Sequence, residues 1–363
     1  MMRANLGTLS SLAGIIAIGG CVGAAAPDAC QPLMSDIQTI GSHNSYKLAI
    51  PPNEFSLLEA QAPEAALALD YAHIPITEQL NLGMRQVELD VFYDPEGGRY
   101  ADPLAPKLAG NEFDATVLDQ AGFKVLHVQD VDPRSSCALF VQCLSEIKTW
   151  SEENSDHVPV LILINAKQAP IELPGATVPL TFDAAAFDAL DAEIRTVFDG
   201  DALISPDTIR GDAQTLRDAV LGDGWASLDQ SRGKVFFALD EGQDVIDVYR
   251  RGRVSLEGLA MFVNSSGAAA PDAAYFTIND PVSDAVKIAA RVREGFIVRT
   301  RADADTQEAR KGDRARLEAA LASGAQYVST DYYQPRTEWS DYLARLPTGD
   351  AVRTNPLSTC RIR

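Results

Sequence analysis

Two histidines follow short apolar segments that have the composition of β-strands. His43 comes after the β-branched run at 37–40, within the sequence Gly-Ser-His-Asn-Ser-Tyr at 41–46, and His127 ends a similar run. An imidazole exchanges protons near neutral pH, and the amide oxygen of Asn44 suits a hard cation. Either segment alone would also fit a hydrogen-bonded polar turn. Taken together, the two segments predict acid–base chemistry beside a metal ion.

Glu88 and Asp90 lie two residues apart in the predicted strand at 86–92. Strand residues with this spacing share a face, so the two carboxylates are expected side by side. Buried neighbouring carboxylates repel each other unless a cation compensates them. A hard metal ion would do so, and ion pairing with Arg85 or Lys167 is the alternative. The pair therefore predicts two ligands of a metal site.

The fourth predicted strand, 158–164, is followed by Asn165 and Lys167. These two residues also share a face if the strand continues. The Asn165 amide oxygen could complete an oxygen ligand set with the carboxylates. Lys167 could hold an anionic oxygen of a substrate, or could instead be a structural partner of Glu88.

Three charged residues close to the last predicted strands are candidates for substrate binding: Arg299, Arg301 and Asp331. Arginine suits bidentate binding of a phosphate. Ion pairing of the arginines with Asp303 or Asp331 is the alternative. Basic groups, two imidazoles and an oxygen-rich cation site together favour phosphodiester cleavage.

The remaining two histidines are given no catalytic role. His73 precedes a predicted helix and is expected to be structural, whereas His157 is expected in an exposed loop. A serine hydrolase is disfavoured, because the chain has no Gly-x-Ser-x-Gly motif.

Short strand-like segments alternate with helical ones along the chain. The predicted strands are 37–40, 86–92, 124–128, 158–164, 234–239, 259–263, 296–298 and 327–329. The predicted helices are 74–82, 139–154, 184–198, 213–221, 281–294 and 306–323. Such alternation predicts an α/β fold with parallel strands, best satisfied by a single-domain, distorted (β/α)8 TIM barrel with its site at the carboxyl ends of the strands. An open doubly wound sheet is the alternative, but no glycine-rich nucleotide motif follows the first strand.

The composition and the N-terminus indicate an exported protein. Residues 1–26 are typical of a signal sequence, which precedes a catalytic domain at 27–363. Cleavage before Cys21 would leave a periplasmic or outer-membrane lipoprotein, and cleavage after Ala26 would release a secreted protein. A net charge of −20 excludes nucleic acid as a partner. In an oxidising compartment, Cys137 could pair with Cys143 and Cys30 with Cys360.

The segments 41–46, 85–90 and 126–127 resemble the bacterial calcium-dependent phosphoinositide phospholipases C, within the wider superfamily of phospholipase C-like phosphodiesterases. The stretches 299–303 and 328–333 are similar to late strands of that group. The resemblance implies a distorted TIM barrel that cleaves phosphatidylinositol or a related phosphoinositide at a transiently bound membrane surface, with no protein partner evident. One departure concerns Asn165, where many relatives have a glutamate, so weaker calcium binding is expected.

The resemblance also implies roles for individual residues. His43 would stabilise the transferring phosphoryl group, and His127 would protonate the departing diacylglycerol oxygen. One calcium ion would be held by four oxygen ligands: Asn44, Glu88, Asp90 and Asn165. A glycerophosphodiesterase or sphingomyelin phosphodiesterase on the same scaffold, and a silent phospholipid-binding barrel, are the alternatives. Glycerophosphodiesterases usually have a His-Arg pair where this sequence has His43-Asn44.

Overall fold

The computed structural model describes residues 1–2 and 30–362. The chain divides into the units Met1–Cys30 and Gln31–Arg363, and the fold below is that of the second unit. The predicted signal at 1–26 lies outside the described residues apart from its first two. Among the described residues, no helix combines the length and apolarity needed to span a membrane.

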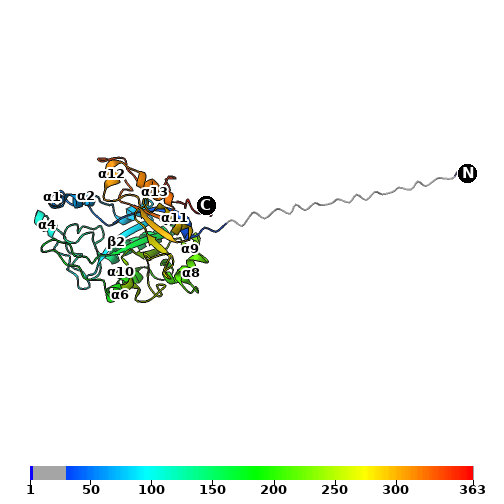
Figure 1. Cartoon of the computed structure of the whole chain (residues 1–363), viewed down its shortest axis with the longest axis horizontal. Helices are drawn as coiled ribbons and strands as arrows, with labels where there is room; N and C mark the ends of the chain where they lie inside the picture. The colour runs from blue at the N-terminus through cyan, green and yellow to red at the C-terminus, as the bar shows by residue number, and fades with distance from the viewer. Residues whose placement is uncertain (3–29, 363) are drawn as a thin grey trace. The chain divides into compact units, whose positions relative to one another are not determined.

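Two five-stranded sheets form the centre of the fold (Figure 1). Their strand orders are β10-β1-β9-β8-β7 and β3-β2-β4-β5-β6. All neighbouring strands are parallel, except that β10 runs antiparallel to β1 and β3 antiparallel to β2. The strands are β1 (Ile37–Ser42), β2 (Gln86–Phe92), β3 (Lys124–Val125), β4 (Val160–Ala166), β5 (Val235–Leu239), β6 (Met261–Val263), β7 (Tyr275–Thr277), β8 (Ile297–Arg301), β9 (Tyr327–Thr330) and β10 (Val352–Thr354).

The two sheets approach each other at β1 and β2. The backbone N–H of Arg85 donates to the carbonyl of Ile40 at 2.9 Å. Gly41 lies so close to Gln86 that a β-carbon at this position would overlap the Gln86 side chain. Gly41 is thus needed for a close approach inside β1, not for a turn after it. The α/β class is confirmed, but the strands form two separate ladders and do not confirm a closed barrel.

The predicted third strand is corrected by the structure. Only Lys124 and Val125 are extended, and they pair antiparallel with β2 as an appendage to its end. The chain then turns back, and Val125 N–H donates to Ala138 at 3.0 Å. The parallel strand missing from the prediction is β7, whose three residues are too few to produce a recognisable alternation.

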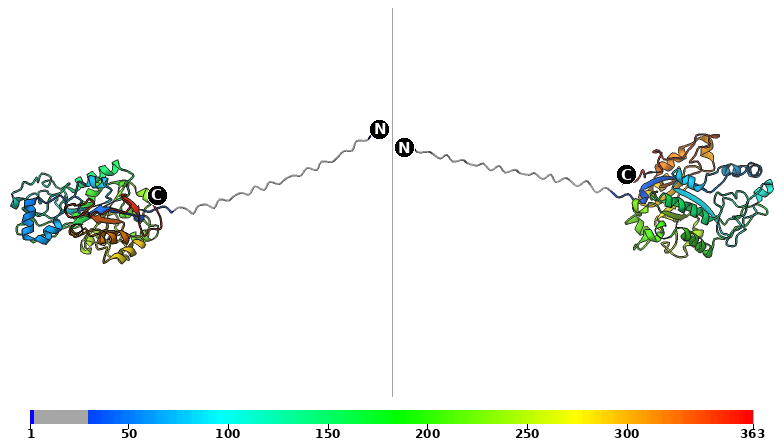
Figure 2. Two further views of the ribbon diagram at one scale, coloured as in Figure 1. Left: turned by 90° about the horizontal axis from the view of Figure 1, so that it is seen from above. Right: turned by 180° about the vertical axis from the view of Figure 1, so that it is seen from behind.

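The helices surround the sheets, with α12 and α13 on one side and α6, α8 and α10 on the other (Figures 1 and 2). The predicted helix at 306–323 is divided at Gly312, which has a positive φ and ends α12. The helices are α1 (Pro52–Gln61), α2 (Pro63–Leu69), α3 (Ile76–Asn81), α4 (Leu104–Ala109), α5 (Phe140–Glu153), α6 (Ala184–Val197), α7 (Pro206–Arg210), α8 (Leu216–Leu221), α9 (Leu228–Ser231), α10 (Gln243–Arg250), α11 (Ala285–Arg293), α12 (Gln307–Lys311) and α13 (Ala315–Ser323), with 3-10 turns η1 (Met34–Asp36) and η2 (Gly200–Ala202).

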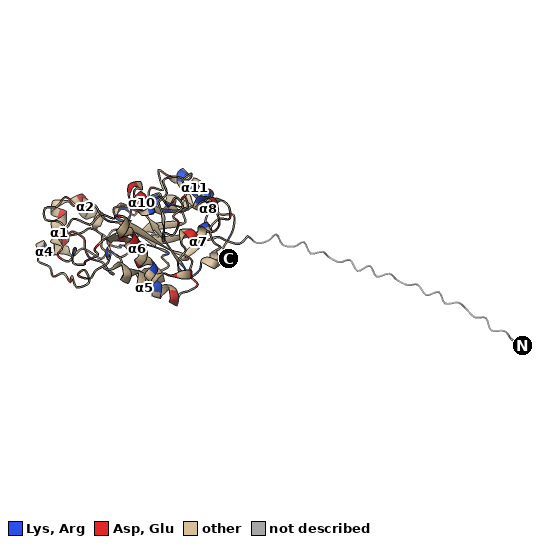
Figure 3. Ribbon diagram, turned by 90° about the horizontal axis from the view of Figure 1, so that it is seen from below, with Lys and Arg blue, Asp and Glu red and all other residues tan. Residues whose placement is uncertain are grey.

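Helix α6 illustrates how local sequence and packing agree. Its N-cap is Asp183, whose side chain accepts a hydrogen bond from the Ala186 N–H at 2.9 Å. Phe187, Leu190 and Ile194 recur at helical spacing and are fully buried in the main core. Such amphipathic helices cover the sheets, and both acidic and basic residues occur along them (Figure 3).

The predicted disulfide between Cys137 and Cys143 is confirmed. The disulfide joins Cys137, just before α5, to Cys143, which lies in the first turns of that helix. The pairing of Cys30 with Cys360 stays a prediction.

Candidate active site

The turn after β1 presents His43 and Asn44. Asn44 has a φ of 45°, a left-handed conformation that asparagine tolerates better than most residues. The backbone N–H of His43 donates to the Thr330 carbonyl of β9 at 3.1 Å. The Asn44 side-chain nitrogen donates to the Tyr71 hydroxyl at 2.7 Å, so its oxygen Oδ1 would be the atom offered to a cation.

His43 is held by a carboxylate on one ring nitrogen. Its Nδ1 lies 2.9 Å from Oδ1 of Asp331, and its Nε2 lies 3.7 Å from Oε1 of Glu88. Burial lowers the pKa of His43 well below 6.5, and the nearby Arg301 guanidinium lowers it further, against the opposing effect of Glu88. The neutral ring therefore donates Nδ1–H to Asp331 and directs Nε2 towards Glu88. Asp331, predicted to bind substrate, here orients His43.

His127 forms a second histidine–carboxylate pair. Its Nδ1 lies 2.8 Å from Oδ2 of Asp132, and the Lys47 ammonium lies 3.2 Å from the same oxygen. Burial by itself would raise the pKa of Asp132, but Lys47 and His127 together lower it. Asp132 thus remains an anion that orients His127. The one local indication of this pairing is the position of Asp132 five residues after His127.

Tyr71 contacts both catalytic candidates. Its ring centroid is 6.1 Å from that of His43 and 6.1 Å from that of His127. The ammonium of Lys47 lies 4.7 Å from the same centroid. The structure thereby brings His43 and His127 to one site, although they come from different parts of the two sheets. Tyr71 and Lys47 were missed, because only tertiary contacts connect them to the histidines.

The four predicted metal ligands lie at neighbouring strand ends. Asp90 and Asn165 are partners in the β2–β4 register, and Asn165 donates from Nδ2 to Oε1 of Glu88 at 3.0 Å. Arg299 pairs with the other Glu88 oxygen at 2.6 Å. The nearest cation to Asp90 is Lys167, with Nζ 3.0 Å from Oδ2.

The state of Asp90 fits a cation site. It is 1% exposed, and although Oδ2 is ion-paired with Lys167, Oδ1 has no hydrogen-bond partner. Buried carboxylate oxygens without donors are costly unless a cation compensates them. No group of three or more His, Cys, Asp or Glu side chains that could hold a metal is found among the described residues. The predicted set of two carboxylates and two amides is of a different kind, and its residues fit an oxygen-ligated cation.

The predicted phosphate ligands occupy different environments. Arg299 is 1% exposed and committed to Glu88 and Asn279. Arg301 has one nitrogen 3.4 Å from Nδ1 of His43 and 3.4 Å from Asp331. Arg301 therefore lies beside His43, whereas Arg299 acts as a buried counter-ion of Glu88.

His157 is not an exposed loop residue, contrary to the prediction. It is buried, its Nε2 lies 2.7 Å from the Ser151 hydroxyl, and its Nδ1 lies 2.7 Å from the Val158 carbonyl. The polar residues before His157 are typical of a surface loop. The ring is nevertheless buried, because the chain enters the core at β4 just after it.

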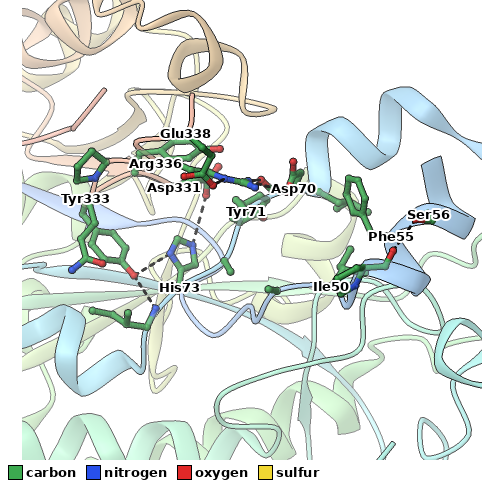
Figure 4. Close-up of a pocket in the computed structure, with 18 residues that line it drawn as sticks. Ile50, Phe55, Ser56, Asp70, Tyr71, His73, Asp331, Tyr333, Arg336 and Glu338 are labelled. Atoms are coloured by element: carbon green, nitrogen blue, oxygen red, sulfur yellow. Dashed lines mark hydrogen bonds and ion pairs between the residues drawn. The ribbon is translucent and has the colours of Figure 1, made fainter. Parts of the chain in front are cut away.

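His73 is structural, as its position before α3 predicted. Nε2 donates to the His43 carbonyl at 2.8 Å, and the ring stacks on Tyr333 (Figure 4). Both residues line a cavity of about 740 Å³ that also includes Asp331 and the apolar Ile50 and Phe55.

We expect His73 to make folding stability depend on pH. Burial lowers the pKa of His73 from 6.5 to about 4, despite the opposing effect of Asp331. Since the folded pKa is below the unfolded one, its contribution is complete above pH 6.5 and is lost as the pH falls towards 4. At pH 5 the loss relative to pH 7.5 should be about 2 kcal/mol. Urea unfolding of wild type and His73→Gln at both pH values measures it, and an equal pH dependence in the two proteins would contradict the assignment.

A second cavity, of about 720 Å³, opens beside His127, Asn165 and Lys167. Asp240 and Glu241, which follow β5, line its other side. Burial raises the pKa of Glu241 to about 7, although its hydrogen bond from the Ala166 N–H opposes the shift. Both acidic residues directly follow the predicted strand at 234–239, but no local pattern connects them with the histidines.

Two histidine–carboxylate pairs beside a group of carboxylate and amide oxygens have the chemical character that phosphodiester cleavage requires. Residues 33–356 match the family model described as "Phosphoinositide phospholipase C, Ca2+-dependent". The chain belongs to this family, and it is an enzyme of the phospholipase C type. No curated protein matches.

Solved structures share the fold. A calcium-dependent phosphoinositol-specific phospholipase C from Pseudomonas sp. is 13% identical with a TM-score of 0.54, covering 91% of this chain and 97% of that one. A calcium-dependent phosphatidylinositol-specific phospholipase C from Streptomyces antibioticus is 17% identical with a TM-score of 0.52, covering 83% and 95%.

Proposed function

We propose that this enzyme cleaves phosphatidylinositol, or a related phosphoinositide, to diacylglycerol and an inositol phosphate with the help of one calcium ion. The observation that carries the proposal is the pairing of His43 with Asp331 and of His127 with Asp132 at one site. Two imidazoles whose Nδ1 atoms are fixed by carboxylates have their Nε2 atoms available for a phosphodiester.

Different residues carry out the separate steps of the proposed reaction. The inositol hydroxyl next to the phosphate attacks phosphorus, and a carboxylate takes its proton. Asp90 suits this role better than Glu88, because Arg299 and Asn165 already occupy both Glu88 oxygens. His43, beside Arg301, takes up a proton when the anionic phosphate binds, and its Nε2–H then donates to a charged phosphoryl oxygen. His127 in its protonated form donates to the diacylglycerol oxygen as the phosphorus–oxygen bond breaks, so an inositol cyclic phosphate is the first product.

Calcium would be held by the oxygens of Asn44, Glu88, Asp90 and Asn165. When bound there, it supplies charge that offsets the phosphoryl oxygens and acidifies the attacking hydroxyl. The Lys167 ammonium, paired with Asp90, lies where it could also contact an anionic substrate oxygen.

We also propose that residues 27–363 form one catalytic domain built as a distorted barrel. Support comes from the edges of the two sheets. Ser45 N–H donates to Glu88 between β1 and β2, and a parallel bridge joins Asn264 to Tyr275 between β6 and β7. The order β1-β2-β4-β5-β6-β7-β8-β9 would then return to β1. The disulfide Cys137–Cys143 supports export through a signal at 1–26.

The test is an assay of the purified enzyme on phosphatidylinositol vesicles, with products followed by phosphorus NMR. A cyclic inositol phosphate is expected. Cleavage of glycerophosphoinositol or sphingomyelin in preference to phosphatidylinositol would replace the proposal with another phosphodiesterase activity. Lipid binding without turnover would instead indicate a silent binding protein.

Asp132→Asn should lower kcat by about 100-fold, because a neutral amide orients the ring less firmly and does not stabilise the His127 imidazolium that acts as the acid. A shift of the basic limb of the pH–rate profile is expected as well, since the His127 imidazolium loses its anionic partner. Asp156→Asn is the matched control, because the Asp156 side chain is 95% exposed. Wild-type kcat and an unchanged pH profile in Asp132→Asn would refute this role.

A further inference from the structure

Tyr71 has no part in the proposed reaction, yet it contacts three of the groups that carry it out. Its ring centroid lies 6.1 Å from that of His43 and 6.1 Å from that of His127. Its hydroxyl accepts a hydrogen bond from Nδ2 of Asn44 at 2.7 Å. One buried side chain thus connects both proposed acid–base groups with a proposed calcium ligand.

The segment that carries Tyr71 is fixed by contacts with three other parts of the chain. The Tyr71 carbonyl accepts a hydrogen bond from the Lys47 ammonium at 2.8 Å. The preceding residue, Asp70, pairs with Arg310 of α12 at 2.6 Å. Asp70 also pairs with Arg336 at 2.8 Å (Figure 4). These contacts limit the movement of the backbone at Tyr71, so the side chain can serve as a fixed support for its neighbours.

The hydroxyl of Tyr71 determines which end of the Asn44 amide faces the cation site. A phenol oxygen can accept a hydrogen bond, whereas an amide nitrogen can only donate one. Because Nδ2 donates to Tyr71, the amide oxygen is left for a cation. Without the hydroxyl, Nδ2 would lose its acceptor, and the amide could turn over and present its N–H groups to the cation. The Asn44 backbone is fixed separately, since its carbonyl accepts from the Lys47 N–H at 2.9 Å.

The ring of Tyr71 restricts the two histidines. Asp331 holds His43 through Nδ1 alone, at 2.9 Å. Asp132 holds His127 in the same way, at 2.8 Å. A hydrogen bond to one nitrogen still allows an imidazole to rock about that contact, and a buried aromatic neighbour limits this movement. Tyr71 is such a neighbour for both rings, so it keeps their Nε2 atoms at the spacing that reaction at one phosphorus atom requires.

We propose that Tyr71 is a positioning residue whose hydroxyl and ring act separately. The hydroxyl turns the Asn44 amide oxygen towards calcium, and the ring keeps His43 and His127 at a working separation. The inference rests on the proposed function, and adds to it a residue that takes no part in the bond changes.

Calorimetric titration with calcium tests the hydroxyl without relying on turnover. Tyr71→Phe keeps the ring and should raise the Kd for calcium by about tenfold, as expected when a group that orients a metal ligand is lost. The activity lost at low calcium should return as calcium is raised. In an Asn44→Ala background, Tyr71→Phe should have no further effect on the Kd, because the hydroxyl acts through Asn44.

Tyr327→Phe is the matched control for the loss of a buried tyrosine hydroxyl. The Tyr327 hydroxyl donates to the Pro159 carbonyl at 3.2 Å. Tyr327 is the first residue of β9, whereas the site follows the last residue of that strand, Thr330. Its replacement should lower the free energy of unfolding and leave the Kd for calcium unaltered.

Tyr71→Leu removes the ring as well as the hydroxyl. At saturating calcium, it should have a kcat on phosphatidylinositol about 100-fold below that of Tyr71→Phe, with little change in KM, because small displacements of reacting groups cost this much. Tyr71→Met should act in the same direction and covers the case in which the leucine variant fails to fold. Urea unfolding accompanies each assay, since a purely structural residue would change the free energy of unfolding and not the kcat of the folded enzyme.

The outcomes separate this inference from the proposed function. An unchanged Kd in Tyr71→Phe, or a loss that adds to that of Asn44→Ala, would overturn the role of the hydroxyl. Equal kcat at saturating calcium in Tyr71→Phe and in the folded variants without the ring would overturn the role of the ring. A wild type that binds no calcium, or that does not cleave phosphatidylinositol, would overturn the proposed function, and this inference with it.

Discussion

Replacing His127 by alanine is expected to lower kcat on phosphatidylinositol by about 10³-fold, because general acid–base groups typically contribute 10²- to 10⁴-fold. His43→Ala should cause a loss of similar size. His127 would no longer protonate the departing oxygen, and without His43 the phosphoryl oxygens would lose a stabilising partner beside Arg301. Initial rates from phosphorus NMR or a soluble chromogenic phosphodiester measure both effects.

The control is His157→Gln. This histidine is buried far from the reacting groups and contacts Ser151, so its loss should reduce the free energy of unfolding but spare kcat at 25 °C. The partly exposed rings of His43 and His127 should behave in the opposite way, with small changes in stability and large ones in rate. Turnover near wild type in either alanine variant would remove that histidine from the mechanism.

Removal of calcium is expected to abolish measurable activity, and added calcium should restore it. Asp90 is the residue on which this expectation depends most, because its buried Oδ1 has no hydrogen-bond donor. Activity with excess EDTA, then with calcium or magnesium returned, provides the first measurement. Magnesium should restore little, since it requires smaller and more regular coordination. Equal activity with and without chelator would disprove the calcium requirement.

Calorimetric titration with calcium examines the ligands without relying on turnover. Asp90→Asn should weaken calcium binding by about tenfold or more, because one ligand charge is lost. Asn165→Glu should strengthen it on the order of tenfold by returning a carboxylate to the site. Asp102→Asn is the control, as the Asp102 side chain is 79% exposed. An unchanged affinity in Asp90→Asn would place the cation elsewhere.

The sequence was informative where a local rule and the tertiary environment coincide. The strands β2 and β4 were predicted nearly to the residue. Strand β4 begins as a continuous apolar run, and β2 alternates apolar with polar residues, a pattern typical of a strand. Helix α6 was predicted for a similar reason, since its cap and its apolar stripe agree. Prediction was poorer for β3 and β7, which are so short that their pairing partners, and not their own residues, make them extended.

In the site, too, some features follow from the local sequence and others from tertiary contacts. The types and spacing of His43, Asn44, Glu88 and Asp90 by themselves determined that acid–base groups and oxygen ligands follow neighbouring strands. Only the tertiary structure decided which carboxylate serves which partner: Asp331 for His43, Asp132 for His127 and Arg299 for Glu88. The partners of His43 and Glu88 lie 288 and 211 positions away, so no local pattern encodes those two pairs. Strand register and burial choose the partners, because a buried charge must find its counter-ion within a few ångströms.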